Sequence, residues 1–557
     1  MSVRNALVLF LALSSLSLLV ACGSSSPRAV PPPSGAFSAS NLNGTYVFSI
    51  SGTDSNGAPY AMVGTLTANG QGGSNGITGG TLDINDADTT VFTSGPIAGA
   101  SIDSSGSYNV GPDGRGQATI RTNISGFQDL TFDFVLSSSF HGLITEFDTF
   151  GSGSGTLDLQ SAGVSPSGSY AFSLSGASYA GAPWATVGNF AYSGGGAVTG
   201  LDDLNEGGLL PYAGSTLTGS LVLGPSTAPA TTLTFENSGS TVFSGLFDVY
   251  AIDATHLKFI EMDETATLSG DAFSQTSPTI PTSSTTMAFT LSGELTGNLL
   301  AAGGFMTTNG TGGITGGEDY NAENGSQVSS TPVPFTANYT AAGTGRYTLG
   351  SFATFVGGSA YSAYPSSGGL LLLEIDTSGI TVGAAYPQST TTFGATSQGY
   401  GLNLTGINVP ASQSVGAAIE VDDIAEFTAS AATSGGGTLT TGIIDENADP
   451  AGVSLGAPFF QLALTNGTYG SLDSLGRYGL SAAAGNNSVS TLNGGFNLTF
   501  YTVDGTTFPF IESDSTQVAT GVFVLQNASA TDPGAAQSHM FVPRPIVRAH
   551  GALRKKN

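Results

Sequence analysis

The chain has one cysteine, Cys22, among its 557 residues, and only four histidines. A single thiol cannot form an intrachain disulfide, so strand pairing and packing must supply the stability. His141, His256, His539 and His550 show no spacing typical of a zinc site, and nothing in the sequence suggests a catalytic triad. The sequence therefore gives no support to a disulfide scaffold or to His- and Cys-based chemistry.

Basic residues are the second shortage, with 12 Lys and Arg against 39 Asp and Glu and a formal net charge of −27. Five of the twelve lie in a basic tail within residues 531–557, namely Arg544, Arg548, Arg554, Lys555 and Lys556. A body with so few cations repels phosphate groups, which argues against a nucleic-acid partner. A terminal run of charge is typical of a solvated chain end.

Long segments with helical periodicity are also absent beyond the N-terminus. The chain instead has 81 glycines and short runs of Val, Ile, Phe, Tyr and Thr between Gly, Asn, Asp and Ser. This pattern predicts an all-β protein with many short strands and tight turns. With Trp184 as the only tryptophan and one cysteine, the Cys…Trp…Cys framework of immunoglobulin domains is missing.

One motif occurs four times with identical internal spacing: Glu-x-Asp, then a glycine, then a glutamine. The copies begin at Glu positions 115, 113 and 138 residues apart. They are Glu146-Asp148-Gly155-Gln160, Glu261-Asp263-Gly270-Gln275, Glu374-Asp376-Gly383-Gln388 and Glu512-Asp514-Gly521-Gln526. We interpret the motif as a hairpin in which Glu ends the seventh strand, Asp bonds its own backbone and Gly takes a positive φ.

Two further marks recur with the motif. Asp-x-Asn occurs in every copy, as Asp83-Asn85, Asp203-Asn205, Asp319-Asn321 and Asp445-Asn447, and we interpret it as a turn. Gly-Arg occurs in three copies, with Arg115, Arg346 and Arg477, whereas the second copy has Ala228. Pairing of these arginines with Glu-x-Asp is an alternative that the sequence leaves open.

The repeats predict four tandem modules of about 115–135 residues, each an eight-stranded up-and-down barrel, with an immunoglobulin-like sandwich as the alternative. The expected ranges are 41–162, 163–278, 279–392 and 393–530. The opening strands at Gly44-Thr-Tyr46 and Gly168-Ser-Tyr170 loosely resemble the Gly-x-Trp opening of calycin barrels, the lipocalin and avidin group. That resemblance implies a closed barrel around a ligand cavity.

The N-terminus reads as a signal helix over residues 1–22, ending in Leu19-Val20-Ala21-Cys22. This ending resembles the lipobox of bacterial lipoproteins, which implies acylation of Cys22 (a palmitate-type modification) and a lipid bilayer as partner. Residues 23–40 form a Ser/Pro-rich tether. The resemblance places the protein in the bacterial envelope, at the outer membrane or cell surface.

The acidic marks raise two chemical hypotheses. Paired carboxylates at i and i+2 share a strand face, as a hydrolase acting on carbohydrate would use them. Oxygen ligands for Ca²⁺ cluster most densely in the first copy, at Asp83, Asn85, Asp86 and Asp88. We interpret both sets as structural, and expect no enzyme and no cofactor, with calcium kept as an open candidate.

The leading hypothesis is a lipid-anchored surface protein that presents its modules as an extended array for binding, adhesion or envelope structure. A glycan or another envelope protein is the expected partner, because several weak sites on one chain act together. The alternatives are a secreted carbohydrate-active hydrolase and a binder of small apolar ligands inside the barrels.

Overall fold

The computed structural model describes residues 37–530, except 94, 208–210, 225–230, 326, 354–359, 409–418, 450–458, 472 and 485–494. By its contacts the chain divides into two compact units, Met1–Pro32 and Pro33–Asn557, and all described residues belong to the second. The predicted signal helix, Cys22, most of the tether and the basic tail lie outside the described residues.

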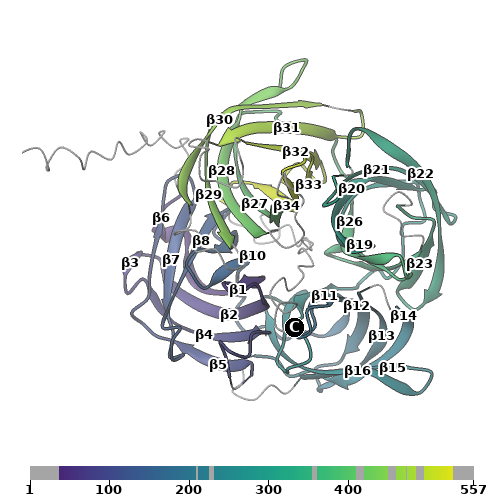
Figure 1. Ribbon diagram of the computed structural model, residues 1–557, viewed down its shortest axis with the longest axis horizontal. Coiled ribbons are helices and arrows are strands. Elements are labelled where there is room, and N and C mark those ends of the chain that lie inside the picture. The colour runs from purple at the N-terminus through teal and green to yellow at the C-terminus, as the bar shows by residue number, and fades with distance from the viewer. Residues whose placement is uncertain are drawn as a thin grey trace, which may run out of the picture. The chain divides into compact units, whose positions relative to one another are not determined.

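Module 1 opens with a short 3-10 helix, η1 (Ala39–Asn41), followed by one ten-stranded antiparallel sheet. Its strands, purple to blue in Figure 1, are β1 (Asn43–Asp54), β2 (Pro59–Asn69), β3 (Gly73–Ser74), β4 (Ile77–Asp86), β5 (Ile97–Ile102), β6 (Ser107–Val110), β7 (Arg115–Arg121), β8 (Asp129–Leu136), β9 (His141–Glu146) and β10 (Gly151–Leu159).

Modules 2 and 3 are closed eight-stranded barrels. Module 2 contains β11 (Gly168–Ala177), β12 (Pro183–Tyr192), β13 (Ala197–Glu206), β14 (Tyr212–Ser220), β15 (Thr231–Asn237), β16 (Ser240–Ala251), β17 (His256–Glu261) and β18 (Ser269–Ser274). Module 3 contains β19 (Thr285–Leu295), β20 (Asn298–Thr308), β21 (Gly313–Ala322), β22 (Gln327–Gly343), β23 (Arg346–Gly350), β24 (Ala360–Ser366), β25 (Gly369–Glu374) and β26 (Gly379–Pro387).

Module 4 is the third closed barrel, green to yellow in Figure 1. Its strands are β27 (Gln398–Asn408), β28 (Ile419–Ala429), β29 (Gly437–Asp449), β30 (Phe459–Ser471), β31 (Arg477–Ala484), β32 (Phe496–Tyr501), β33 (Thr507–Glu512) and β34 (Gln517–Leu525). The barrels are up-and-down meanders in which the last strand pairs with the first, so the barrel prediction is confirmed and the sandwich alternative is wrong.

Module 1 departs from the closed barrel at its fourth strand. In module 3, β22 pairs with β21 along one part and with β23 along the other. In module 1 the same span is split by a turn at Asp103–Gly106, so that β5 pairs with β4 and β6 pairs with β7. The sheet is curled in the same order but is interrupted there, although β1 still pairs with β10.

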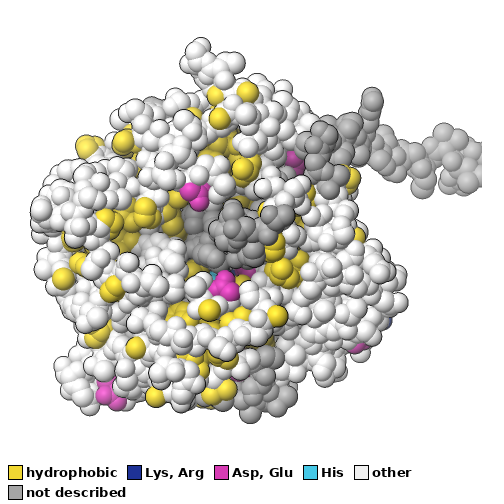
Figure 2. All heavy atoms as spheres, turned by 180° about the vertical axis from the view of Figure 1, so that it is seen from behind, with side chains coloured by type: hydrophobic (Ala, Val, Ile, Leu, Met, Phe, Trp, Pro, Cys, Tyr) yellow, Lys and Arg dark blue, Asp and Glu magenta, His cyan; other side chains and the backbone are white. Residues whose placement is uncertain are grey.

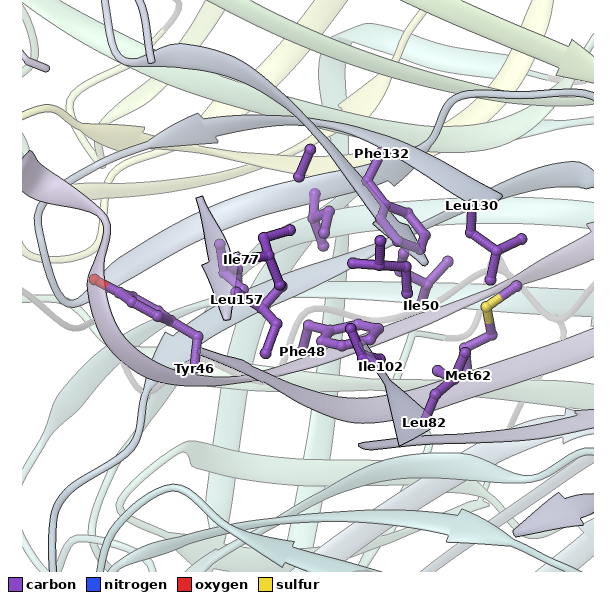
Figure 3. Close-up of a cluster of buried hydrophobic side chains, with 14 of the residues drawn as sticks. Tyr46, Phe48, Ile50, Met62, Ile77, Leu82, Ile102, Leu130, Phe132 and Leu157 are labelled. Atoms are coloured by element: carbon purple, nitrogen blue, oxygen red, sulfur yellow. The ribbon is translucent and has the colours of Figure 1, made fainter. Parts of the chain in front are cut away.

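Each module has its own apolar core, made by the side chains that point inward at every second position along its strands. Figure 3 shows this core in module 1, where Phe48 and Ile50 of β1, Met62 of β2 and Phe132 of β8 lie among other buried side chains. Aromatic rings are numerous, and Phe393 alone lies within 6 Å of six other rings in module 4. These side chains occupy the barrel interiors.

The repeated glycine of each Glu-x-Asp motif does not take a positive φ, so that part of the prediction is wrong. Gly155 on β10 and Gly270 on β18 lie in the last strand of their modules, paired with the first strand. A Cβ on Gly155 would lie 1.6 Å from the Ser49 carbonyl oxygen, and one on Gly270 would lie 2.0 Å from that of Ser173. Close approach of the two strands that close the sheet is therefore the reason for glycine.

The distribution of charge differs from what composition suggests. Twenty-one Asp and Glu residues are buried among the described residues, against three basic ones, Lys258, Arg346 and Arg477. On the face in Figure 2, acidic side chains appear in only a few places. No helix among residues 37–530, where described, is long and apolar enough to cross a membrane.

Candidate functional site

The repeated polar marks meet at the contacts between successive modules. We call these the first interface (modules 1 and 2), the second (2 and 3), the third (3 and 4) and the closing interface (4 and 1). At each one, the Asn of Asp-x-Asn donates to backbone carbonyls of the next module's Glu-x-Asp hairpin. The bonds run from Asn85 to Glu261 (2.8 Å) and Ala266 (2.8 Å), from Asn205 to Glu374 (2.9 Å) and Gly379 (3.0 Å), from Asn321 to Glu512 (3.1 Å) and Gln517 (2.7 Å), and from Asn447 to Glu146 (2.8 Å) and Gly151 (2.8 Å).

The closing glutamine of each module makes the second shared contact. Its Nε2 donates to a carbonyl of the following module: Gln160 to Ala251 (2.7 Å), Gln275 to Pro365 (2.9 Å), Gln388 to Thr502 (3.0 Å) and Gln526 to Leu136 (3.0 Å). An amide donating to buried carbonyls satisfies groups that would otherwise be costly to bury.

These contacts form a closed cycle, because Asn447 and Gln526 of module 4 bond to module 1. Apolar side chains of the two modules also pack there, with Val135 and Leu143 against Ile424, Val522 and Val524. The expected extended array is therefore wrong. The Asn and Gln hydrogen bonds that join successive modules also join module 4 to module 1.

At the second and third interfaces, the arginine of Gly-Arg pairs with the Asp of the preceding module's Asp-x-Asn. Arg346 contacts Asp203 through two nitrogens, with Nε to Oδ2 at 2.7 Å, and the Tyr364 hydroxyl donates to the same carboxylate. Arg477, Asp319 and Tyr501 repeat this arrangement, with Arg477 Nε to Asp319 Oδ2 at 2.6 Å. Such buried bidentate pairs fix geometry as well as energy.

The closing interface has arginine and aspartate at the same positions, but the arginine makes one contact with the aspartate instead of two and the tyrosine is absent. Arg115 Nη1 lies 3.0 Å from Asp445 Oδ2 of module 4, while Arg115 Nε lies 3.0 Å from Asp113 of its own module. Val135, eleven residues before Glu146, takes the place that Tyr364 and Tyr501 have at the second and third interfaces. Pairing of arginine with Glu-x-Asp, the alternative left open by the sequence, is not what the structure shows.

At the first interface the residue that replaces arginine, Ala228, lies outside the described residues. Asp83 instead accepts a hydrogen bond from the Tyr250 hydroxyl (2.5 Å) and one from the Gly99 backbone (2.6 Å). A second polar group lies nearby, where Lys258 Nζ is 2.9 Å from Asp271 of its own module and 3.5 Å from Asp158 of module 1.

Each of those two aspartates also contacts a histidine. His141 Nδ1 lies 2.7 Å from Asp158, and His256 Nε2 lies 2.8 Å from Asp271. Burial alone would raise the pKa of Asp158, but the Lys258 ammonium and His141 lower it below the ordinary value. Leu143 and Leu371 occupy the position of Lys258 in modules 1 and 3. This position therefore carries a charge at the first interface and an apolar side chain in modules 1 and 3.

The interpretation of Asp-x-Asn as a turn is wrong, because all four copies lie on strands. Asp83 and Asn85 belong to β4, and both are fully buried at the first interface. In the calcium set, Asp86 Oδ1 accepts from the Asp88 backbone and Asp88 Oδ1 from Thr90. Among the described residues no three His, Cys, Asp or Glu side chains are grouped as a metal ion would require, and calcium stays an untested prediction.

The aspartate of each Glu-x-Asp organises its hairpin. Asp148 Oδ1 accepts from the Phe150 backbone (2.7 Å) and Oδ2 from Thr131 on the preceding hairpin (2.8 Å). Asp263, Asp376 and Asp514 make the equivalent two bonds. The side chain thus bonds its own turn, as the sequence suggests, and also connects it to the neighbouring strand.

The glutamate of each motif ends the seventh strand and is fully buried. Glu261 accepts from the Leu268 backbone (3.3 Å) and Glu374 from the Thr381 hydroxyl (3.0 Å), whereas neither oxygen of Glu146 or Glu512 has a hydrogen-bond donor among the described residues. Burial, and next the neighbouring aspartate, raise the pKa of Glu374 to about 8.

Burial likewise raises the pKa of Glu146, Glu261 and Glu512 well above the ordinary value. A buried carboxyl without a cationic partner favours the neutral form. Their surroundings therefore favour the neutral, protonated form of these glutamates.

Sequence reasoning missed the interface tyrosines, Tyr250, Tyr364 and Tyr501, and gave Lys258 no role at an interface. A signal was present: each tyrosine precedes its glutamate by ten or eleven residues. Lys258 is one of only five basic residues between the tether and the basic tail.

No protein-family model and no curated protein matches the chain. The chain is similar to several solved structures, including two of transferrin binding protein B. A transferrin binding protein B mutant from Haemophilus parasuis Hp5 is 9% identical, with 74% of this chain and 83% of that chain covered and a TM-score of 0.15. An intact transferrin binding protein B named Ap-TbpB, with N and C lobes, is 10% identical, with 73% and 85% covered and a TM-score of 0.15. At that TM-score the likeness carries no argument about this chain.

Proposed function

We propose that this chain is a lipid-anchored protein of the bacterial envelope whose four modules form one non-catalytic platform for binding or envelope structure. The observation that carries the proposal is that the repeated marks take part in contacts between modules. Asn and Gln do so at all four interfaces, and arginine does so at three. The repeated chemistry thus serves assembly.

The alternative of a carbohydrate-active hydrolase has less support. The paired carboxyls of Glu-x-Asp would have to reach a scissile bond from both sides, yet Glu146, Glu261, Glu374 and Glu512 have no exposed surface. Their aspartates are occupied by backbone N–H groups. A neutral, buried acid held by a hairpin is suited to packing rather than to substrate.

The alternative of a small apolar ligand inside each barrel also has less support. Phe48 and Phe132 lie with their ring centroids 5.8 Å apart in module 1, and Phe289 and Phe352 lie 5.3 Å apart in module 3. Such rings fill the interior of an eight-stranded barrel, which is only wide enough for side chains or one small ligand.

Membrane attachment is tested by fractionation of a Cys22→Ser variant. We expect the wild-type chain in the membrane fraction and the variant in the soluble fraction. Recovery of the variant with the membrane after signal cleavage would show that lipid on Cys22 is not the anchor.

Binding is tested with the full mature chain on a glycan array, with the same glycans assayed for hydrolysis. Retention without product supports the platform, and equal retention by Glu146→Gln and Glu512→Gln variants is expected. Hydrolysis that is lost in a correctly folded Glu→Gln variant would overturn the non-catalytic assignment. No retention of any glycan would leave an envelope protein as the partner to capture by crosslinking in cells.

A further inference from the structure

One guanidinium at the closing interface faces four carboxyl groups. Arg115 contacts Asp113 and Asp445 directly, each at 3.0 Å. Asp133 on β8 and Glu426 on β28 are buried in the same group, where Asp133 interacts with Asp445 and Arg115, and Glu426 with Asp113 and Arg115. We call these five residues the Arg115 cluster. If all four carboxyls were ionised, its net charge would be −3.

The second and third interfaces have a different balance. There, one arginine makes a bidentate contact with one aspartate, and a tyrosine hydroxyl donates to the same carboxylate. Arg477 also interacts with Asp473 of its own module, so two carboxyls face one arginine at the third interface. In the Arg115 cluster, four carboxyls surround one arginine.

The remaining contacts of the cluster are uncharged. Gln117 of β7 donates to Asp133 (2.9 Å), Thr428 of β28 donates to Glu426 (3.3 Å), and the Gln461 backbone of β30 donates to Asp445. Among the described residues of β7, β8, β28, β29 and β30, Arg115 is the one cation that contacts the cluster. Mutual repulsion of the ionised carboxyls would act directly across the interface.

We propose that the closing interface is a pH-sensitive latch, in which Asp133 and Glu426 are neutral acids while modules 4 and 1 are in contact and become ionised when the modules separate. The device goes beyond the proposed platform, because it lets the cycle of modules open at one defined place.

The direction of the pH dependence follows from the two environments. Burial, and next the charge of Asp445, raise the pKa of Asp133 to about 7 in the closed interface, while burial and the charge of Asp113 raise the pKa of Glu426 to about 8. Once separated and solvated, both groups return to pKa values near 4. Closure of the interface is therefore accompanied by proton uptake. Each group lowers the closed-to-open ratio by up to about tenfold per pH unit as pH rises, Asp133 between about pH 4 and 7 and Glu426 between about pH 4 and 8. Above about pH 8 the ratio levels off.

The test measures distances between paired spin labels in the full chain with Cys22→Ser. The labels replace the exposed residue that follows the aspartate of each Glu-x-Asp motif. Thr149→Cys with Ser515→Cys reports on the closing interface, and Glu264→Cys with Thr377→Cys is the matched pair across the second. Distance distributions are recorded from pH 4 to pH 9.5, with circular dichroism to verify that the barrels stay folded.

We expect the closing pair to lengthen or broaden as pH rises towards 8 and then to remain constant, while the second pair stays unchanged. In an Asp133→Asn, Glu426→Gln variant, the closing pair should keep its acid-pH distance at every pH. A closing pair that never changes, two pairs that change together, or a change that persists in the double variant would each overturn the latch.

Discussion

The second interface and the first interface join modules in the same way but with different charges. In the second, Arg346 makes a bidentate contact with Asp203. In the first, the aspartate at the equivalent position, Asp83, contacts a tyrosine hydroxyl and a backbone N–H. The ionic contribution at the first interface comes from Lys258, which lies between Asp271 on the neighbouring strand β18 and Asp158 on β10 of module 1.

The difference separates what the junction requires from what it tolerates. The asparagine and glutamine bonds to backbone carbonyls occur at all four interfaces, whereas each ion pair is local. A hydrogen bond from a side-chain amide to a carbonyl of the next hairpin depends on backbone geometry, which is the same in every repeat. A buried charge depends only on a nearby countercharge, which can come from another strand.

The largest loss of stability is expected when a buried interface arginine is replaced. Arg477→Met leaves Asp319 buried without its countercharge, which should cost about 3–5 kcal/mol of unfolding free energy. Denaturant unfolding measures it. Adding Asp319→Asn should recover part of the loss, and no recovery would show that packing rather than charge is responsible.

A slightly smaller loss is expected at the first interface. Lys258→Met should cost about 3 kcal/mol, because Asp158 and Asp271 then face each other without a shared cation. Arg121→Ala, which removes an exposed pair with Asp129, is the control and should change stability by less than about 0.5 kcal/mol. Equal losses in the two variants would contradict the ionic role of Lys258.

The third prediction concerns the pH dependence of the buried glutamates. The pKa of Glu374 is about 8 in the folded state and near 4.5 when unfolded, so the folded state holds a proton that the unfolded state lacks between these values. Stability should fall as pH rises through that window and level off above about pH 8. A Glu374→Gln variant lacks this contribution, and about 3 kcal/mol of the wild-type decline between about pH 5.5 and 8 should be missing from its profile. Parallel profiles for the two proteins would show that Glu374 does not titrate with a raised pKa.

The fourth prediction tests what all interfaces share. Asn205→Ala removes two hydrogen bonds and leaves the carbonyls of Glu374 and Gly379 unsatisfied, which should cost about 1–3 kcal/mol. Asn85→Ala at the first interface should lose a similar amount by the same thermal or denaturant measurement. A loss of stability at the second interface only would mean that the ion pairs, and not the hydrogen bonds of the asparagine side chains, define the junction.

The sequence was sufficient for the fold because its signals are local. The alternating pattern of Tyr46, Phe48 and Ile50, the glycine turns and the fourfold spacing all depend on neighbouring residues, and they predict meander barrels. The interruption of the fourth strand in module 1 has no such signal beyond a turn at Asp103. It could not be predicted, because the fourth strand is a single element elsewhere.

The partners of the repeated marks could not be predicted for a different reason. Asp and Asn favour turns by local propensity, and only the packing of a neighbouring module makes Asp203 and Asn205 buried interface residues. Arg115 and Asp445 are 330 residues apart in sequence. Nothing local connects them, and one sequence alone does not show which module follows the fourth.

The central claim is that module 4 contacts module 1 and closes the cycle. It is tested most directly by a double-mutant cycle on Arg115 and Asp445, with unfolding free energies measured for Arg115→Met, Asp445→Asn and the double variant at pH 6. A closed cycle predicts a coupling energy of about 1–3 kcal/mol between the two sites. Strict additivity, with a coupling below about 0.3 kcal/mol, would contradict closure.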